Sequence, residues 1–139
     1  MNSRKSLDTL PHWVPATGHA LRHVGVHFDA VRIAGFLGED VAYRLMEFTD
    51  FRAGPIVRAE TGPQYHYFLL PPGAAAGHAW PAPARALGRS GGAGGGEAFV
   101  GIPALYGVTW PLGWRSRPTE EDPFVEPGLL YEMAVRALA

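Results

Sequence analysis

The stretch that decides the predicted fold is His23-Val24-Gly25-Val26-His27-Phe28-Asp29-Ala30-Val31-Arg32-Ile33. Apolar and polar residues alternate along it, which is typical of a strand with one face on a core and the other toward solvent or a cleft. The polar face would carry the side chains of His23, His27 and Asp29. Because it combines two imidazoles with a carboxylate, this face is where we expect any chemistry to begin.

The composition predicts one folded domain. The chain has 139 residues, of which 47% are hydrophobic and 18% are charged, enough to build a core of its own. Its net charge of −1 argues against a general attraction to nucleic acid or to anionic membranes. The absence of cysteine excludes disulfides and thiolate metal sites, and it makes a reducing cytoplasm the expected compartment. No apolar run is long enough to predict a signal peptide or a membrane span.

The rest of the pattern predicts two main helices and several short strands. Acidic residues after Gly38 suit a helix start, and apolar residues follow at helical spacing as far as Thr49, with Glu39 turned away from them. Residues 55–60 and 65–70 form a predicted hairpin around a Gly-Pro turn. Pro127 is well placed to begin a final helix. The predicted fold class is therefore a single α/β (α+β) domain with a mostly antiparallel sheet and two main helices.

The remaining segments have less regular patterns. Residues 1–11 are polar and predict a flexible arm before a domain that covers residues 12–139. Residues 88–97 form a glycine-rich loop without the Gly-Lys-Ser/Thr ending of a phosphate-binding P-loop. Residues 98–102 and 108–110 predict two strands of a second hairpin. The acidic run at residues 119–122 predicts one helical turn.

Three short motifs follow one another in an order found in a known family. They are Val14-Pro15-Ala16-Thr17-Gly18 with His27-Phe28-Asp29-Ala30-Val31, then Glu60-Thr61-Gly62-Pro63-Gln64-Tyr65-His66-Tyr67-Phe68, then Phe99-Val100-Gly101-Ile102-Pro103 continuing to Trp110. With these motifs the chain resembles the N-terminal domain of bifunctional DNA primase-polymerases (prim-pol). It is also similar to small actinobacterial proteins. The resemblance implies a primase-polymerase-like α/β domain.

The resemblance also bears on catalysis. In the family, two aspartates two residues apart on one strand hold the divalent metals that drive nucleotidyl transfer. Asp29 matches the first aspartate, but Val31 occupies the second position, and one carboxylate cannot form a two-metal clamp. The family histidine falls on Tyr65, one residue before His66, and a one-residue offset reverses the face on which a strand side chain lies. The resemblance therefore implies a chain without the catalytic residues, metal or cofactor of its family.

The first functional hypothesis is a non-catalytic accessory or binding module for nucleotide or nucleic acid. Arginines beside aromatic rings can hold a nucleotide or a single strand by charge and stacking. The candidate ligand-binding residues are His27, Asp29, Arg58, His66, Trp114 and Arg115. Arg32, Arg117, Tyr65 and Trp110 have the same chemistry. The structural alternative is that the tryptophans fill the core while the arginines keep its rim soluble.

Two further hypotheses come from other functional classes. Aromatic strands and the C-terminal helix could serve a protein-interaction or homo-oligomeric scaffold. A metal-dependent enzyme could use His27 and Asp29, since same-face residues of a strand stand about 7 Å apart and can converge on one ion. The identity of the ligand or partner and the oligomeric state stay open at this point.

Overall fold

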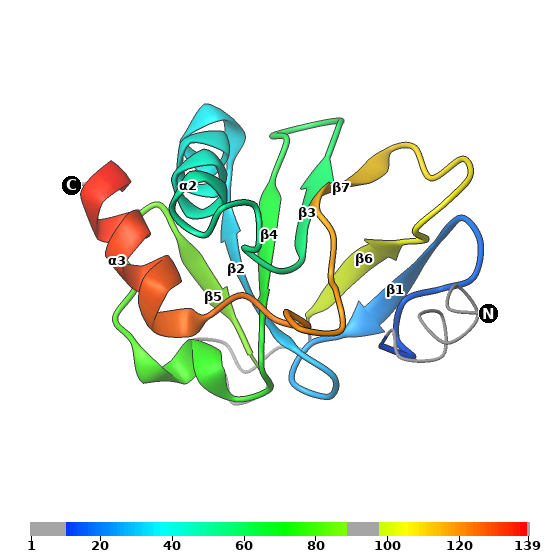
Figure 1. Ribbon diagram of the computed structural model, residues 1–139, viewed down its shortest axis with the longest axis horizontal. Coiled ribbons are helices and arrows are strands. Elements are labelled where there is room, and N and C mark those ends of the chain that lie inside the picture. Colours follow the sequence, from blue (N-terminus) through cyan, green and yellow to red (C-terminus); the bar gives the residue numbers. More distant parts are fainter. Residues whose placement is uncertain (1–10, 89–97, 139) are drawn as a thin grey trace.

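A five-stranded antiparallel sheet forms the centre of the structure, a computed structural model that describes residues 11–88 and 98–138. The strand order is β5-β2-β4-β3-β7, and each neighbouring pair runs antiparallel (Figure 1). The strands are β2 (Asp29–Ile33), β3 (Ile56–Ala59), β4 (His66–Leu70), β5 (Arg85–Leu87) and β7 (Leu112–Ser116). The described residues form a single α+β domain, as the sequence predicts.

In the described residues, two α-helices cover one face of this sheet. They are α2 (Gly35–Phe48) and α3 (Pro127–Leu138). Leu45 of α2, Phe68 of β4 and Leu130 of α3 are fully buried in the core between helices and sheet. Figure 1 shows both helices on the same side of the strands. The helical spacing of apolar residues in the sequence thus builds the first core.

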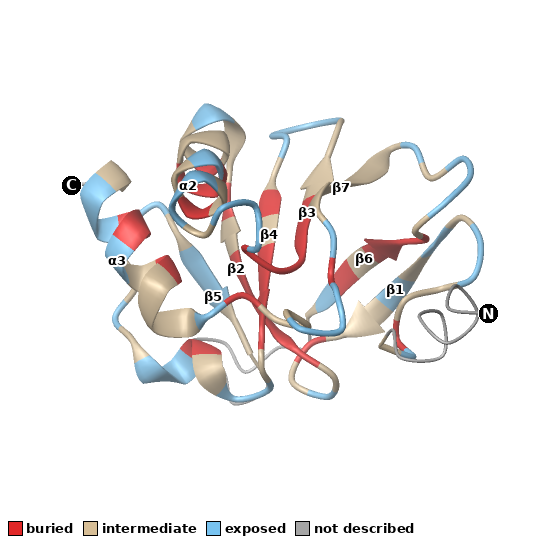
Figure 2. Cartoon of the chain, viewed as in Figure 1, coloured by how far each residue is buried: buried red, intermediate tan, exposed pale blue. Residues whose placement is uncertain are grey.

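A second, smaller layer covers part of the opposite face. It consists of β1 (His19–His23) and β6 (Phe99–Pro103), which pair antiparallel with each other. Trp13, Phe28, Leu69 and Ile102 meet in the core between this layer and the main sheet. Figure 2 shows buried segments in β2, β4 and β6, where the layers are in contact.

The predicted continuous strand over residues 23–33 is wrong, because a turn divides it. Gly25 adopts a positive φ of 86°, which favours glycine, and its N–H donates to the Phe28 carbonyl. Val24 and Phe28 are both buried in the second core. The alternating apolar and polar residues therefore belong to two strands, β1 and β2, and these strands lie in different sheets.

Three predicted elements are confirmed with small shifts of their ends. The first helix begins at Gly35 rather than near Gly38. Residues 56–59 and 66–70 form the predicted hairpin, with Val57 opposite Tyr67. The final helix begins at Pro127, and the Glu126 carboxylate accepts hydrogen bonds from the N–H groups of Gly128 and Leu129. In these elements apolar residues repeat at helical or strand spacing, and glycine or proline marks the ends. The sequence predicts them correctly for this reason.

The late strands match the prediction only in part, because β6 lies within one residue of the predicted strand at residues 98–102 while the rest differs. Residues 108–110 form no strand; Val108 and Trp110 are exposed, and the strand β7 begins at Leu112. β6 pairs with β1 instead of forming a hairpin with the segment that follows it. Residues 119–122 form a turn closed by a hydrogen bond from the Thr119 N–H to the Asp122 carbonyl, not a helical turn.

Two predicted segments cannot be compared with the structure in full. Most of the flexible arm predicted at residues 1–11 and most of the glycine-rich loop predicted at residues 88–97 lie outside the described residues. Within the described ranges, no helix has the length and apolarity needed to cross a bilayer.

Candidate functional site

Asp29, the residue that carries the family resemblance, lies inside the protein. Its side chain is on the helix-covered face and is only 1% exposed. Oδ2 accepts a hydrogen bond of 3.0 Å from the Ala75 N–H, in the short 3-10 helix η1 (Ala74–Gly77). Oδ1 has no hydrogen-bond partner among the described residues. Asp29 therefore anchors η1 to β2 and does not present a carboxylate to solvent.

The other members of the predicted polar face do not join Asp29. His27 lies in the turn after β1, where its ring meets the His12 ring edge-on at 4.6 Å. The His23 ring packs against Phe99 at 4.9 Å. In residues 11–88 and 98–138, no group of three or more histidine, aspartate or glutamate side chains is placed to hold a metal ion. The division of the strand thus separates the three side chains that the sequence places on one face.

Three of the predicted binding residues, Arg58, His66 and Arg115, do meet, and they meet at Glu39. Arg115 holds both carboxylate oxygens, with Nη2 at 2.7 Å from Oε2 and Nε at 2.9 Å from Oε1. His66 Nε2 lies 3.1 Å from Oε1, and Arg58 Nη1 lies 3.8 Å from the same oxygen. Arg58 also donates to Glu60, at 3.0 Å from Nη2. We call these five residues the Glu39 cluster.

A β-bulge positions Arg115 in the Glu39 cluster. Val57 is opposite Trp114 and Ile56 is opposite Ser116, so Arg115 is the extra residue between the two pairs. The guanidinium then reaches across to α2, where Nη1 also contacts the Met46 sulfur at 3.3 Å. Hydrogen bonds from Arg115 hold the pKa of Glu39 below its usual range. The cluster therefore ties α2 to the edge of the sheet.

The histidine of the cluster has no access to a substrate. Burial lowers the pKa of His66, although Glu39 acts in the opposite direction. Its second nitrogen, Nδ1, is buried without a partner in the described residues. A Cβ placed on Gly38 would lie 2.6 Å from Nδ1, so the helix backbone already occupies the space that a substrate would need. The Glu39–His66 pair lacks the geometry of an acid–base dyad, which needs a reachable nitrogen.

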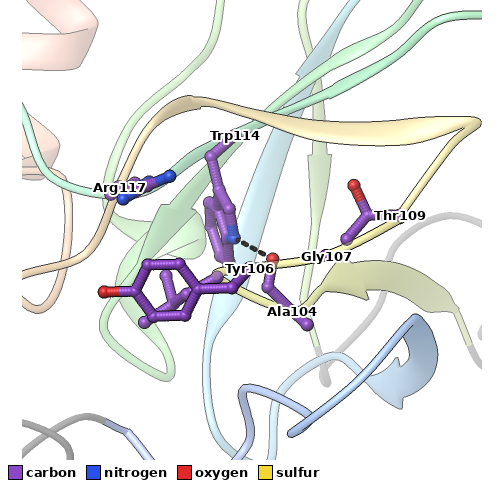
Figure 3. A pocket seen from close by; sticks show the side chains of 7 residues that line it. Ala104, Tyr106, Gly107, Thr109, Trp114 and Arg117 are labelled. Carbon is purple, nitrogen blue, oxygen red and sulfur yellow. Dashed lines mark hydrogen bonds between the residues drawn. The ribbon is translucent and has the colours of Figure 1, made fainter.

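Trp114 lies on the opposite face of the sheet from the Glu39 cluster. Its Nε1 donates to the Ala104 carbonyl at 3.1 Å, and its ring packs at the margin of the second core. Together with Tyr106 and Arg117, it lines a separate hollow (Figure 3). Of the six predicted binding residues, three therefore converge, while His27, Asp29 and Trp114 lie in three other places.

A second group of arginines gathers on the face that carries Trp114, at the end of the sheet formed by β5, β2 and β4. Arg32 lies with its guanidinium carbon 4.2 Å from the centre of the Tyr65 ring. The Tyr65 and Tyr67 rings meet edge-on at 6.0 Å. Arg85 is the direct cross-strand partner of Arg32, so both side chains share this face. We call these four residues the arginine–tyrosine platform.

The charges of the platform are not neutralised by any described residue. Among the described residues, neither Arg32 nor Arg85 has a carboxylate within ion-pair distance. Burial raises the pKa of Tyr67, and the neighbouring charge of Arg32 partly offsets this effect. Two adjacent cations beside two aromatic rings are suited to a planar, anionic ligand.

The sequence identifies only part of each group. Arg32 and Tyr65 are among the residues that the sequence indicates by their charge and aromatic chemistry. Arg85 lies between two prolines and a glycine run, where no strand is predicted.

The sequence predicts that Glu39 faces away from the apolar side of its helix. This orientation allows its carboxylate to contact Arg115 of β7. Glu39 could be recognised as part of the group only from its position near Arg58 and Arg115. That position depends on the order of the strands in the sheet.

Comparison of the chain with known protein families, with curated proteins and with solved structures gave no match.

Proposed function

We propose that the protein is a non-catalytic binding module that holds a nucleotide or single-stranded nucleic acid on the arginine–tyrosine platform. The observation that carries the proposal is the position of the Arg32 guanidinium, 4.2 Å from the Tyr65 ring centre and directly across the strand pair from Arg85. Aromatic rings stack on bases, and arginines attract the phosphates that join them. The platform brings arginines and aromatic rings together on the neighbouring strands β5, β2 and β4.

The repulsion between Arg32 and Arg85, which lowers the stability of the sheet, supports a role in binding. Like charges placed directly opposite each other on a sheet destabilise it by a few tenths of a kcal/mol or more. Arg32 and Arg85 form such a pair and, in the part of the chain that the structure describes, no acid compensates them. A bound anion would supply the missing negative charge.

Within this proposal, the protein is a primase-polymerase-like domain without the family's catalysis. Val31, which stands where the family has its second aspartate, is fully buried in the first core. Asp29 is buried as well and bonded to the backbone of η1. A pair of metal ions would need two reachable carboxylates at these positions. Template-directed primer synthesis in the presence of Mg²⁺ or Mn²⁺ would overturn this part of the proposal.

Binding is tested by fluorescence anisotropy with a labelled oligothymidine of about twelve nucleotides, a length within the usual footprint of single-strand binding proteins. We expect Arg32→Gln to weaken binding about five- to tenfold and to reduce the dependence of log K on log[salt] by about 0.7, the loss of one phosphate contact. Tyr65→Ala should weaken binding by at least as much, because stacking contributes about 1–3 kcal/mol per base.

The matched control is Arg136→Gln, which also removes one positive charge. Arg136 lies in an exposed pair with Glu132 on α3, a helix that covers the face of the sheet opposite to the platform. Its binding curve should overlay that of the wild type. Equal losses in Arg136→Gln and Arg32→Gln would mean that only net charge matters, and no binding by the wild type at low salt would remove the proposal altogether.

A second candidate function, a protein-interaction or homo-oligomeric scaffold, is favoured by a different observation. The loop between β6 and β7 exposes three large apolar side chains: Tyr106 at 67%, Val108 at 87% and Trp110 at 68%. Aromatic residues of this kind are enriched at the centres of protein interfaces. Light scattering after size exclusion tests the oligomeric form of this function, since a monomer at all concentrations would exclude it.

A further inference from the structure

A hollow beside the loop between β6 and β7 lies apart from the arginine–tyrosine platform. It has a volume of about 310 Å³, at the small end of the range for ligand sites. Figure 3 shows the Trp114 indole and the Tyr106 ring at this hollow, with Arg117 beside them and Thr109 across from them. The backbone of Ala104 to Gly107 completes the lining. Two aromatic rings in so small a space suit a flat ligand of one or two rings.

Arg117 supplies the charge of this hollow. Its guanidinium carbon lies 5.4 Å from the centre of the Tyr106 ring, within the range of a cation–π contact. No carboxylate lies within ion-pair distance of Arg117 in residues 11–88 and 98–138. The residues lining the hollow include no acid. Arg117 is therefore a cation whose donors are available to a ligand.

Two other donors of the hollow, the Thr109 hydroxyl and the Trp114 indole N–H, are already engaged with the protein. The Thr109 hydroxyl donates to the Leu112 carbonyl at 2.8 Å, and Trp114 Nε1 donates to the Ala104 carbonyl at 3.1 Å. Neither donor hydrogen remains for a ligand. Recognition of charge thus falls to one guanidinium, whose fork matches the two oxygens of a single carboxylate.

A neighbouring hollow, which also contacts Arg117, has the opposite character. It has a volume of about 240 Å³ and is lined by Glu121 and Asp122 as well as by Arg52. Arg52 is paired with Asp122 at 3.1 Å. An anion in this second hollow would meet two carboxylates, whereas an anion in the first would meet none. The charge around Arg117 therefore directs an anionic ligand to the hollow beside Trp114.

We propose that the hollow formed by Tyr106, Trp114 and Arg117 is a binding site for a small aromatic monocarboxylate. The ring of the ligand stacks on the indole or the phenol, and its carboxylate receives the fork of Arg117. Inorganic phosphate is a poorer match, because the fork of Arg117 can hold it but it has no ring to stack on the indole or the phenol. The site is independent of the proposed nucleotide platform, with which it shares no residue.

The experiment is a titration of the isotope-labelled protein with benzoate, followed by amide and indole NMR shifts. We expect saturable shifts at Trp114 and along residues 104–109. Arg117→Gln should weaken binding at least tenfold, as expected when a charged hydrogen bond is lost. Because Arg117 is exposed, this variant should fold as the wild type does.

Four comparisons make the result decisive. Arg52→Gln removes a guanidinium that lines only the second hollow, and Arg32→Gln alters only the platform, so both should bind benzoate within twofold of the wild type. Benzamide, which has the same ring without the charge, should bind at least tenfold more weakly than benzoate. Inorganic phosphate should not displace benzoate. The proposal is overturned by the absence of shifts in the wild type, by unchanged binding in Arg117→Gln, or by equal binding of benzamide.

Discussion

The Glu39 cluster and the arginine–tyrosine platform each bring arginines together on the same sheet, but on opposite faces and with opposite charge balance. In the cluster, Arg58 and Arg115 face two carboxylates, and each of these carboxylates accepts hydrogen bonds from them. On the platform, Arg32 and Arg85 face each other and two tyrosines. The cluster is satisfied by the protein itself, whereas the described residues supply no acid to the platform, the place where we propose a ligand.

This difference separates a structural role from a binding role. An arginine already held by two carboxylate oxygens would have to give them up to receive a phosphate. An arginine above an aromatic ring keeps its donors and is positioned in advance, which reduces the entropy lost on binding. The comparison predicts that changes in the cluster alter folding and leave binding intact, while changes on the platform do the reverse.

The largest expected effect comes from Gly38→Ala, a change beside the Glu39 cluster. The added Cβ would lie 2.5 Å from the Ile33 carbonyl and 2.6 Å from His66 Nδ1, both in a packed interior. We expect the free energy of unfolding to fall by about 3 kcal/mol, measured by urea denaturation. Gly77→Ala is the matched control, because a Cβ there meets nothing within 4 Å and the change should stay within about 0.5 kcal/mol.

The second effect concerns the charge at the centre of the cluster. Glu39→Gln keeps the size of the side chain but leaves Arg115 and Arg58 without their shared partner. We expect a loss of about 1–3 kcal/mol in unfolding free energy, because charged hydrogen bonds are lost at a partly exposed site. Asp40→Asn, which alters an exposed pair with Arg44 on the same helix, should cost under about 0.5 kcal/mol. Equal effects of the two substitutions would contradict the structural role of the cluster.

The third effect is a dependence on acid. Burial lowers the pKa of His66, so the folded state binds this proton less readily than the unfolded state. The pKa of Glu39 is lowered too, chiefly by Arg115. Stability should therefore be full above pH 6.5 and fall below it, because the unfolded state takes up a proton on His66 more readily than the folded state. It should fall again below pH 4.5, where the unfolded state takes up a proton on Glu39 more readily. Urea denaturation at a series of pH values from above 6.5 to below 4.5 measures this dependence of the unfolding free energy on pH. His66→Gln should remove the fall that begins at pH 6.5.

The smallest effect on stability, and the one of opposite sign, is expected on the platform. Arg85→Gln removes one of two like charges that lie directly opposite each other, so the unfolding free energy should rise by about 0.3 kcal/mol. The same variant should bind the labelled oligothymidine more weakly. A more stable variant that binds more weakly would support a binding role for the platform. A less stable variant with unchanged binding would instead give the platform a structural role, like that of the Glu39 cluster.

The sequence predicts the elements of this fold better than their partners. The helix from Gly35 and the hairpin around Gly62 have local periods and local stop signals, and both are found. The turn at Gly25 was missed because Val24 and Phe28 keep the alternation of a strand while the backbone between them reverses. Local patterns of apolar residues do not distinguish one long strand from two strands in different sheets.

For the candidate site residues, the sequence indicates the type of side chain but not its place in the fold. Arg58, His66 and Arg115 belong together, but the residue that unites them, Glu39, is 76 positions before Arg115. Trp114 and Arg115 are adjacent in sequence and lie on opposite faces, as neighbours in a strand do. Which arginine meets an acid and which meets a ring depends on strand order, and strand order is set by contacts distant in sequence.

The pairing of β1 with β6 has a consequence for the order in which the protein folds. This pairing joins His23 to Phe99, so it closes a loop that contains most of the main sheet, and such closures are slow and entropically costly. The hairpin of β3 and β4 closes a loop of a few residues between Ala59 and Tyr65. We expect pulsed hydrogen exchange during refolding to protect the amides of β4 before those of β1. The small layer is then the last part of the chain to assemble, on a main sheet that is already formed.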